Sequence, residues 1–189
     1  MTWLDERVAP GRLELIRTFV NTRDIARGPE AFRSPADARA WFVAHGLVGR
    51  DLRLGATGLR STLELREAFR SLLLANAGSP LPASATSTIN DAAARARLAP
   101  RLAEDGSSRL TLGARGLDGA LGALTAVMFE AIAAGTWTRL RACATCQWAF
   151  YDASRNRSSR WCDMSICGNR AKQDALRHRR KASPLTSST

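Results

Sequence analysis

The sequence predicts a mainly α-helical protein: a helical N-terminal domain with a small β-hairpin, followed by a small cysteine-containing unit made of a β-knuckle and a helix. Three observations predict this class. Apolar residues recur at helical spacing, one stretch alternates around an Asp-Gly pair, and all four cysteines lie near the C-terminal end. From these patterns we place the domains at residues 1–136 and 137–181, and we expect a disordered tail at 182–189.

Several segments of the N-terminal domain have the pattern of bundle helices. Apolar side chains three or four residues apart mark residues 13–20, 59–73 and 117–132. Ser34 followed by Pro35 predicts the start of a shorter helix, which Gly46 ends. The alanine-rich stretch 86–98 is the remaining helix of the predicted bundle.

Residues 101–112 alternate between apolar and polar side chains around Asp105-Gly106, a pair typical of a tight hairpin turn. We expect a two-stranded ribbon packed on the helices. Gly135-Thr136 marks the expected boundary between the two domains. No apolar run approaches the about 20 residues that a membrane span requires, so no membrane partner is expected.

The four cysteines form two closely spaced pairs, Cys143 with Cys146 and Cys162 with Cys167. Four thiolates at about 2.3 Å from Zn²⁺ make a closed tetrahedron that leaves no position for a substrate. The spacing therefore predicts one structural Zn²⁺ bound by all four sulfurs, which makes the C-terminal unit a four-cysteine zinc finger.

Other readings of the cysteines stay open at this point. They could form two disulfides or a thioredoxin-like redox pair, but the chain opens without an apolar signal segment, which favours the reducing cytoplasm. Oxidation of the zinc thiolates under stress would turn the finger into a redox switch. His178 could be a ligand, although four cysteines already complete the tetrahedron.

Positive charge is concentrated around the cysteines. The chain has a net charge of +11, of which residues 137–189 carry +8, since they hold 11 Lys and Arg against 3 Asp. Such a concentration attracts a polyanion, because each neutralised phosphate releases a counterion. The candidate nucleic-acid-binding residues are Arg155, Arg157, Arg160, Asn169, Arg170, Lys172, Arg177, Arg179, Arg180 and Lys181.

Short strands are expected on both sides of Cys143 and Cys146, and a helix is expected to begin at Cys167. Three aromatic side chains of the finger, Trp148, Phe150 and Trp161, are expected to form either a small core or a platform for a nucleobase. The helix is expected to lean on the knuckle through Ala171, Ala175 and His178.

The finger resembles a known family. The run Cys167-Gly168-Asn169-Arg170, together with Cys143-x-x-Cys146, is similar to the CGNR zinc finger over residues 139–177. In that family the finger follows an ABATE domain, described as a stress-induced transcription regulator, and residues 13–24 resemble the Phe-Val-Asn-Thr helix that opens it. The resemblance implies zinc on the four cysteines.

The sequence predicts a binding protein rather than an enzyme, because it contains no phosphate loop, nucleophile elbow or His-Glu-x-x-His pair. A polar cluster at the end of the first helix, Asn21, Arg23 and Asp24, is a possible small-molecule site. The favoured function is a DNA-binding bacterial transcription regulator, with a helical domain that senses a signal or forms a homodimer. The alternatives are an RNA-binding or ribosome-associated zinc protein, and a small-molecule-binding helical domain with a protein-interaction finger.

Overall fold

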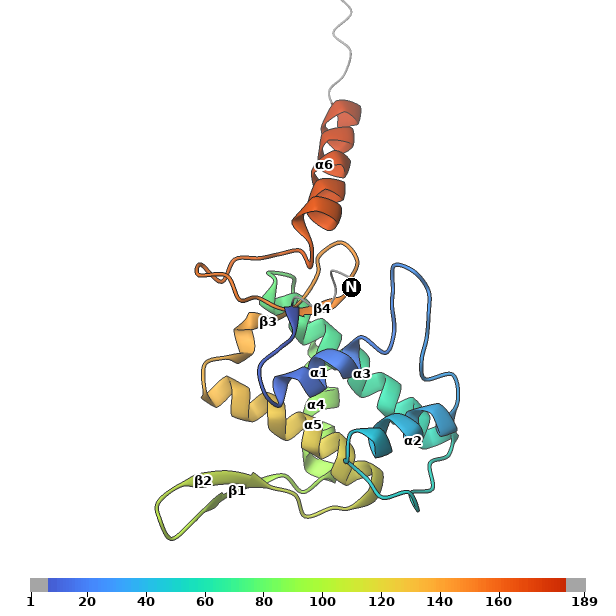
Figure 1. Ribbon diagram of the computed structural model, residues 1–189, viewed down its shortest axis with the longest axis vertical. Helices are drawn as coiled ribbons and strands as arrows, with labels where there is room; N and C mark the ends of the chain where they lie inside the picture. Colours follow the sequence, from blue (N-terminus) through green and yellow to red (C-terminus); the bar gives the residue numbers. More distant parts are fainter. Residues whose placement is uncertain (1–6, 183–189) are drawn as a thin grey trace, which may run out of the picture.

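The computed structural model describes residues 7–182, with side chains up to residue 179, and much of this length is helical (Figure 1). The helices are α1 (Leu13–Val20), α2 (Pro35–Ala44), α3 (Ala56–Asn76), α4 (Ala83–Arg95), α5 (Gly116–Ala133) and α6 (Asn169–Ala182). Two antiparallel hairpins pair β1 (Ala99–Leu102) with β2 (Ser108–Thr111), and β3 (Leu140–Ala142) with β4 (Ala149–Tyr151). The predicted fold class is confirmed. Of the tail expected at 182–189, residues 183–189 lie outside the described part, and Ala182 ends α6.

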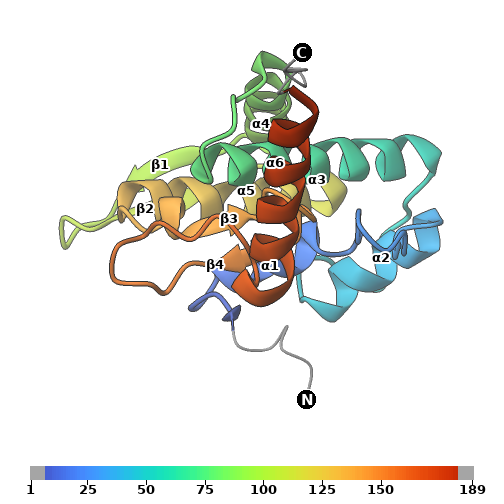
Figure 2. The same cartoon turned by 90° about the horizontal axis from the view of Figure 1, so that it is seen from above.

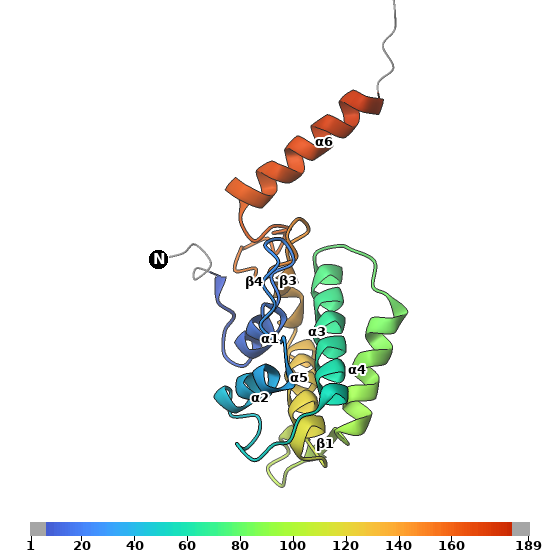
Figure 3. The same ribbon diagram turned by 90° about the vertical axis from the view of Figure 1, so that its right-hand side faces the viewer.

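Helix α3 is the centre of the bundle and contacts α1, α2, α4 and α5. Figure 3 shows α4 on one side of α3 and α1 and α2 on the other. The apolar spacing in α1 puts Ile16, Phe19 and Val20 on one fully buried face. Phe19 meets Phe69 of α3 edge to face, with ring centroids 6.3 Å apart. Aromatic pairs of this kind add about 0.5–1.5 kcal/mol beyond the area they bury.

Helix α5 is, among the described residues, long and apolar enough by length and composition to cross a membrane, which the sequence patterns did not lead us to expect. Within the fold it packs against α1, α3 and α4. Leu121, Leu124 and Val127 are at most 2% exposed. This packing is that of a core helix, which is apolar because it is surrounded by other helices.

The hairpin β1–β2 turns at Asp105-Gly106 as predicted, and Gly106 has a φ of +80°, a conformation that glycine adopts without steric cost. Its strands are largely exposed, and Leu102 is 78% exposed. The ribbon therefore extends from the bundle, at the end opposite α6, and packs on the helices less than we expected (Figure 1).

The hairpin β3–β4 is part of the helical core. Trp137, Leu140, Ala142 and Ala149 are buried in the same cluster as the apolar faces of α1, α3 and α5. The side-chain amide of Asn76, in the last turn of α3, donates to the backbone oxygens of Trp137 and Leu140 at 3.0 and 2.8 Å. The core is therefore continuous across the turn at residues 135–136.

Candidate metal centre

The four cysteine sulfurs lie within 4.8 Å of one another and form the metal-ligand cluster of the described residues. The Sγ atoms of Cys146 and Cys162 are 3.5 Å apart, and those of Cys162 and Cys167 are 3.7 Å apart. A tetrahedron with Zn–S bonds of about 2.3 Å has edges of about 3.8 Å, so these separations fit Zn²⁺. They are too long for disulfides, whose sulfurs are about 2.05 Å apart. The predicted structural zinc site is confirmed.

The pKa values of the clustered thiols are shifted in different directions. Hydrogen bonds from Cys146 and Cys162 lower the pKa of Cys143. The hydrogen bond to Cys143 raises the pKa of Cys146 to about 12, and hydrogen bonds with Cys143 and Cys146 raise that of Cys162 as well. Bound Zn²⁺ would deprotonate all four thiols, because a coordinating thiol loses its proton to the metal.

Short-range hydrogen bonds fix the backbone conformation of both cysteine knuckles. In the first, Gln147 N–H donates to the Cys143 oxygen at 2.8 Å, with Gln147 at a φ of +61°. In the second, the Asp163 carboxylate accepts from Ile166 N–H at 2.9 Å and caps a short π-helix, Met164–Gly168. A Cβ on Gly168 would lie 2.4 Å from the Met164 sulfur, so any other residue at this position of the CGNR run would have to displace the Met164 side chain.

Aromatic side chains enclose the zinc ligands as a second small core. Phe150 is 1% exposed and packs with three of the cysteines, while Trp148 and Trp161 cover the cluster and are partly exposed. Arg7 donates to the Trp161 oxygen at 2.9 Å, and its guanidinium lies 5.0 Å from the Phe150 ring centroid. The small core predicted for the finger is therefore present, and two of its aromatic side chains keep some exposure.

Two buried arginines of α3 were not singled out by the sequence patterns: Arg70 attaches the knuckle to the bundle, and Arg66 holds the loop that follows α1. Arg70 is 3% exposed and donates to the backbone oxygens of Gln147 and Val20, both at 2.8 Å. Arg66 is 1% exposed and makes a two-pronged ion pair with Glu30, at 2.7 and 2.8 Å. One feature of the sequence could have indicated these two arginines. They are four residues apart, which places them on the same side of α3, next to its apolar positions.

A second buried ion pair shapes the arginine-rich loop. Asp152 is 1% exposed, and its carboxylate accepts from the backbone N–H groups of Ser154 and Ser159, both at 3.0 Å. Arg141 lies 3.7 Å from this carboxylate and donates to the Ser159 oxygen at 3.0 Å. The loop between strand β4 and Cys162 is therefore tied down at both ends.

The candidate nucleic-acid residues lie on two exposed surfaces, the loop and α6. Arg155, Arg157 and Arg160 are exposed on the loop, and a groove of about 350 Å³ runs past this loop beside Arg7, Trp161 and Met164. Asn169, Arg170, Lys172, Arg177 and Arg179 are exposed on α6. The side chains of Arg180 and Lys181 lie outside the described residues.

Helix α6 extends away from the bundle (Figures 1 and 3), and Figure 2 looks at the molecule from the side of this helix. The expected lean on the knuckle is wrong beyond the first turn, since Ala171 is partly buried but Ala175 and His178 are exposed. The helix is held at its start, where Asn169 donates to the Ser165 oxygen at 2.8 Å and Thr145 donates to the Cys167 oxygen at 3.2 Å.

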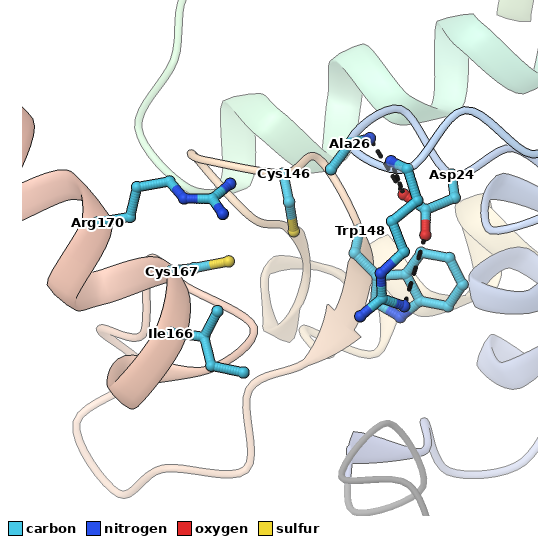
Figure 4. A pocket seen from close by; sticks show the side chains of 8 residues that line it. Asp24, Ala26, Cys146, Trp148, Ile166, Cys167 and Arg170 are labelled. Atoms are coloured by element: carbon cyan, nitrogen blue, oxygen red, sulfur yellow. Dashed lines mark hydrogen bonds and ion pairs between the residues drawn. The ribbon is translucent and has the colours of Figure 1, made fainter.

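The three residues proposed as a small-molecule site have separate surroundings. Asn21 uses its amide to hold strand β4, and the Arg23 backbone bridges to Glu30. Asp24 instead lines a pocket of about 130 Å³ between the bundle and the finger, with Arg27, Trp148 and Arg170 (Figure 4). Cys146, Cys167, Ala26 and Ile166 complete its lining.

Residues 13–141 match the ABATE family, which carries the description "putative stress-induced transcription regulator", and residues 139–180 match the CGNR zinc finger. The two matches overlap on residues 139–141, where strand β3 lies in the structure. A search of curated proteins returns no match. Because the first match spans more than half of the chain, the protein belongs to the ABATE family, and it carries a CGNR zinc finger over residues 139–180.

Proposed function

We propose that the protein is a DNA-binding transcription regulator of the bacterial cytoplasm and that its zinc finger contacts the DNA. The observation that carries this proposal is α6, a helix that projects from the molecule with exposed arginine and lysine side chains. Arg170, Lys172, Arg177 and Arg179 point to solvent, and the described part of this helix buries no large apolar side chain. The family description supports a role in transcription.

The dimensions of α6 suit duplex DNA. Its 14 residues span about 21 Å at about 1.5 Å per residue, and a helix about 10–12 Å wide fits a major groove about 12 Å wide. The loop arginines Arg155, Arg157 and Arg160 lie on the same finger and would reach phosphates next to the groove. In this arrangement zinc has a structural role, since Cys167 precedes the helix that makes the contact.

The test uses the zinc-loaded full chain and a labelled duplex in a salt series. If about six phosphates are neutralised, the logarithm of affinity should fall against the logarithm of salt with a slope of about −5. The double variant Arg177→Gln/Arg179→Gln should reduce the steepness of the slope by about 2. The variant Arg109→Gln, which removes a charge from strand β2, is the control and should keep the slope. Binding with no salt dependence would overturn the proposal.

The helical part has two candidate roles, sensing a signal or pairing two subunits. The pocket between Asp24 and Arg170 supports the first role, because its lining residues come from both the bundle and the start of α6. Sedimentation of the zinc-loaded chain with and without DNA tests the second role.

An RNA-binding protein is the second candidate, supported by the groove beside the arginine loop. Trp161 is partly exposed there, and the Arg160 guanidinium lies 5.9 Å from its ring centroid. Stacking of a base on such a ring is worth about 1–3 kcal/mol. Competition between duplex DNA and single-stranded RNA for the full chain separates the candidates. Trp161→Ala should weaken RNA binding more than duplex binding if the groove takes a base.

A further inference from the structure

One of the four zinc ligands differs from the others in its exposure. Cys143, Cys162 and Cys167 are buried, at 0%, 5% and 4% exposed, whereas Cys146 is partly exposed. Its side chain lines the pocket of about 130 Å³ between the bundle and the finger. Figure 4 shows the sulfurs of Cys146 and Cys167 directed toward this space, so a small molecule in the pocket reaches a zinc ligand.

The walls of the pocket favour reaction at a thiolate. Arg170 enters it from α6 (Figure 4). Arg27, which pairs with Asp24 at 3.8 Å, lines it from the bundle. Reactive cysteines in proteins are partly exposed and have positive neighbours, whereas buried structural cysteines are inert. A zinc-bound cysteine is already a thiolate, the nucleophilic form. Cys146 meets both conditions, whereas Cys167 shares the pocket but is only 4% exposed, and Cys143 and Cys162 do not line it.

The size of the pocket selects small reagents. A site needs roughly 10–15 Å³ to hold one water, so about 130 Å³ admits on the order of ten water-sized molecules. A peroxide such as hydrogen peroxide fits this space.

We propose that Cys146 is an oxidation site of the finger and that small peroxides reach its sulfur through this pocket. The Cys146 thiolate attacks one peroxide oxygen, the O–O bond breaks, and hydroxide leaves, so that the sulfur loses two electrons and becomes a sulfenic acid. The Cys162 sulfur, 3.5 Å away, then attacks the oxidised sulfur. The S–S bond forms as a second hydroxide leaves. The two thiolates together lose two electrons to the peroxide, and zinc loses two of its four ligands and is released.

Release of zinc would remove the contacts that fix the start of α6. Cys167 lies in the π-helix that runs into α6, and the contacts that fix the helix start belong to residues next to the metal. If the finger binds DNA as proposed above, oxidation of Cys146 would end that binding. The oxidation step itself does not depend on DNA, so its test and the DNA test fail separately.

To test this, the zinc-loaded full chain is treated with hydrogen peroxide, and zinc release is followed with a chelating dye. The oxidation state of each cysteine is then determined by mass spectrometry after alkylation. The expected first product joins Cys146 to Cys162, and it appears together with the released zinc. First products at another cysteine pair, reaction of all four cysteines at one rate, or no zinc release while the bundle stays folded would each overturn the proposal.

Two variants test the route. Ala26 is exposed and lines the pocket, so Ala26→Leu narrows the pocket and should slow zinc release several-fold. Arg170→Gln should also slow release, because it removes a positive neighbour of the thiolate. The matched controls are Ala40→Leu on α2 and Arg109→Gln on β2, both exposed and remote from the finger, and both should release zinc at the unchanged rate. Equal rates for Ala26→Leu and Ala40→Leu would show that peroxide does not enter by the pocket.

Discussion

The side-chain amide of Asn21 forms two hydrogen bonds with the backbone of Ala149, donating to its oxygen at 2.9 Å and accepting from its N–H at 2.8 Å. A neighbouring β-strand would satisfy the same two groups. Asn21 follows α1 directly, and Ala149 begins β4. The first helix of the bundle is therefore joined to the last strand before the arginine loop by one side chain.

Asn21→Asp should destabilise this junction. A carboxylate cannot donate to the Ala149 oxygen and repels it, so one buried acceptor loses its partner at a cost of about 1–3 kcal/mol. Urea unfolding of the zinc-loaded chain measures the loss. Asn90→Asp, the same change at an exposed position of α4, is the control and should leave the midpoint unchanged. Equal midpoints for the two variants would contradict the role of Asn21.

Loss of a ligand should remove the metal. Cys143→Ser replaces a fully buried thiolate, and zinc binding contributes on the order of 10 kcal/mol to folding in small fingers. Metal analysis should find one zinc per chain in the wild type and much less in the variant. Ala144→Ser, which adds a hydroxyl next to the site, should keep the zinc. A variant Cys143→Ser that still holds one tightly bound zinc would contradict the four-cysteine assignment.

The arginines of the finger should fall into two groups, those that stabilise the fold and those that contact DNA. Arg141 lies 3.7 Å from the buried Asp152 and donates to the backbone oxygens of Arg157 and Ser159, so Arg141→Gln removes these bonds and should cost about 1–3 kcal/mol. Arg155 is exposed, so Arg155→Gln should leave the unfolding midpoint unchanged and weaken duplex binding. Thermal unfolding and DNA titration of both variants check this division. It fails if Arg155→Gln unfolds the loop or if Arg141→Gln has no effect on stability.

Acid should weaken the link between α3 and the loop that follows α1. Burial tends to raise the pKa of Glu30, but the Arg66 hydrogen bond and charge, with the Phe32 backbone N–H, outweigh burial and lower it below its usual value of 4.5. A lowered pKa means that the pair stabilises the fold above about pH 4.5 and that this contribution is lost as pH falls through the folded pKa.

The variant Glu30→Gln tests this dependence. It should be less stable than the wild type at pH 7, by on the order of 3 kcal/mol, because Arg66 stays buried without its main partner. The difference should shrink below about pH 4.5. Glu104→Gln, exposed in the β1–β2 turn, is the control. A difference that is constant from pH 7 to pH 3 would contradict the pair's role.

The repeating features of the fold could be predicted from the sequence. The apolar spacing of α1 and α5, the Ser34-Pro35 helix start and the Asp105-Gly106 turn are each set by neighbours within a few residues. The zinc ligands were predictable for the same reason, since two short spacings bring the sulfurs together.

The attachment of the finger could not be predicted, because it depends on residues far apart in the chain. Arg70 reaches Gln147 across 77 positions, and Asn21 reaches Ala149 across 128. A polar residue on an otherwise apolar helix face looks like any exposed residue until its partner is known. The lean of α6 on the knuckle was predicted because alanines at helical spacing suggest packing, whereas Ala175 and His178 are exposed.

Strand β3 belongs to the core of the bundle and leads directly into the first zinc ligand. A segment cut at the first cysteine knuckle would leave behind Trp137 and Leu140, together with the Asn76 amide that holds them. Transplanting this finger onto another protein would require copying Asn21, Arg70 and Asn76 from the helices as well. The smallest transferable unit is therefore larger than the metal-binding motif, and substitutions at Asn21 and in α3 should alter zinc affinity although no cysteine is changed.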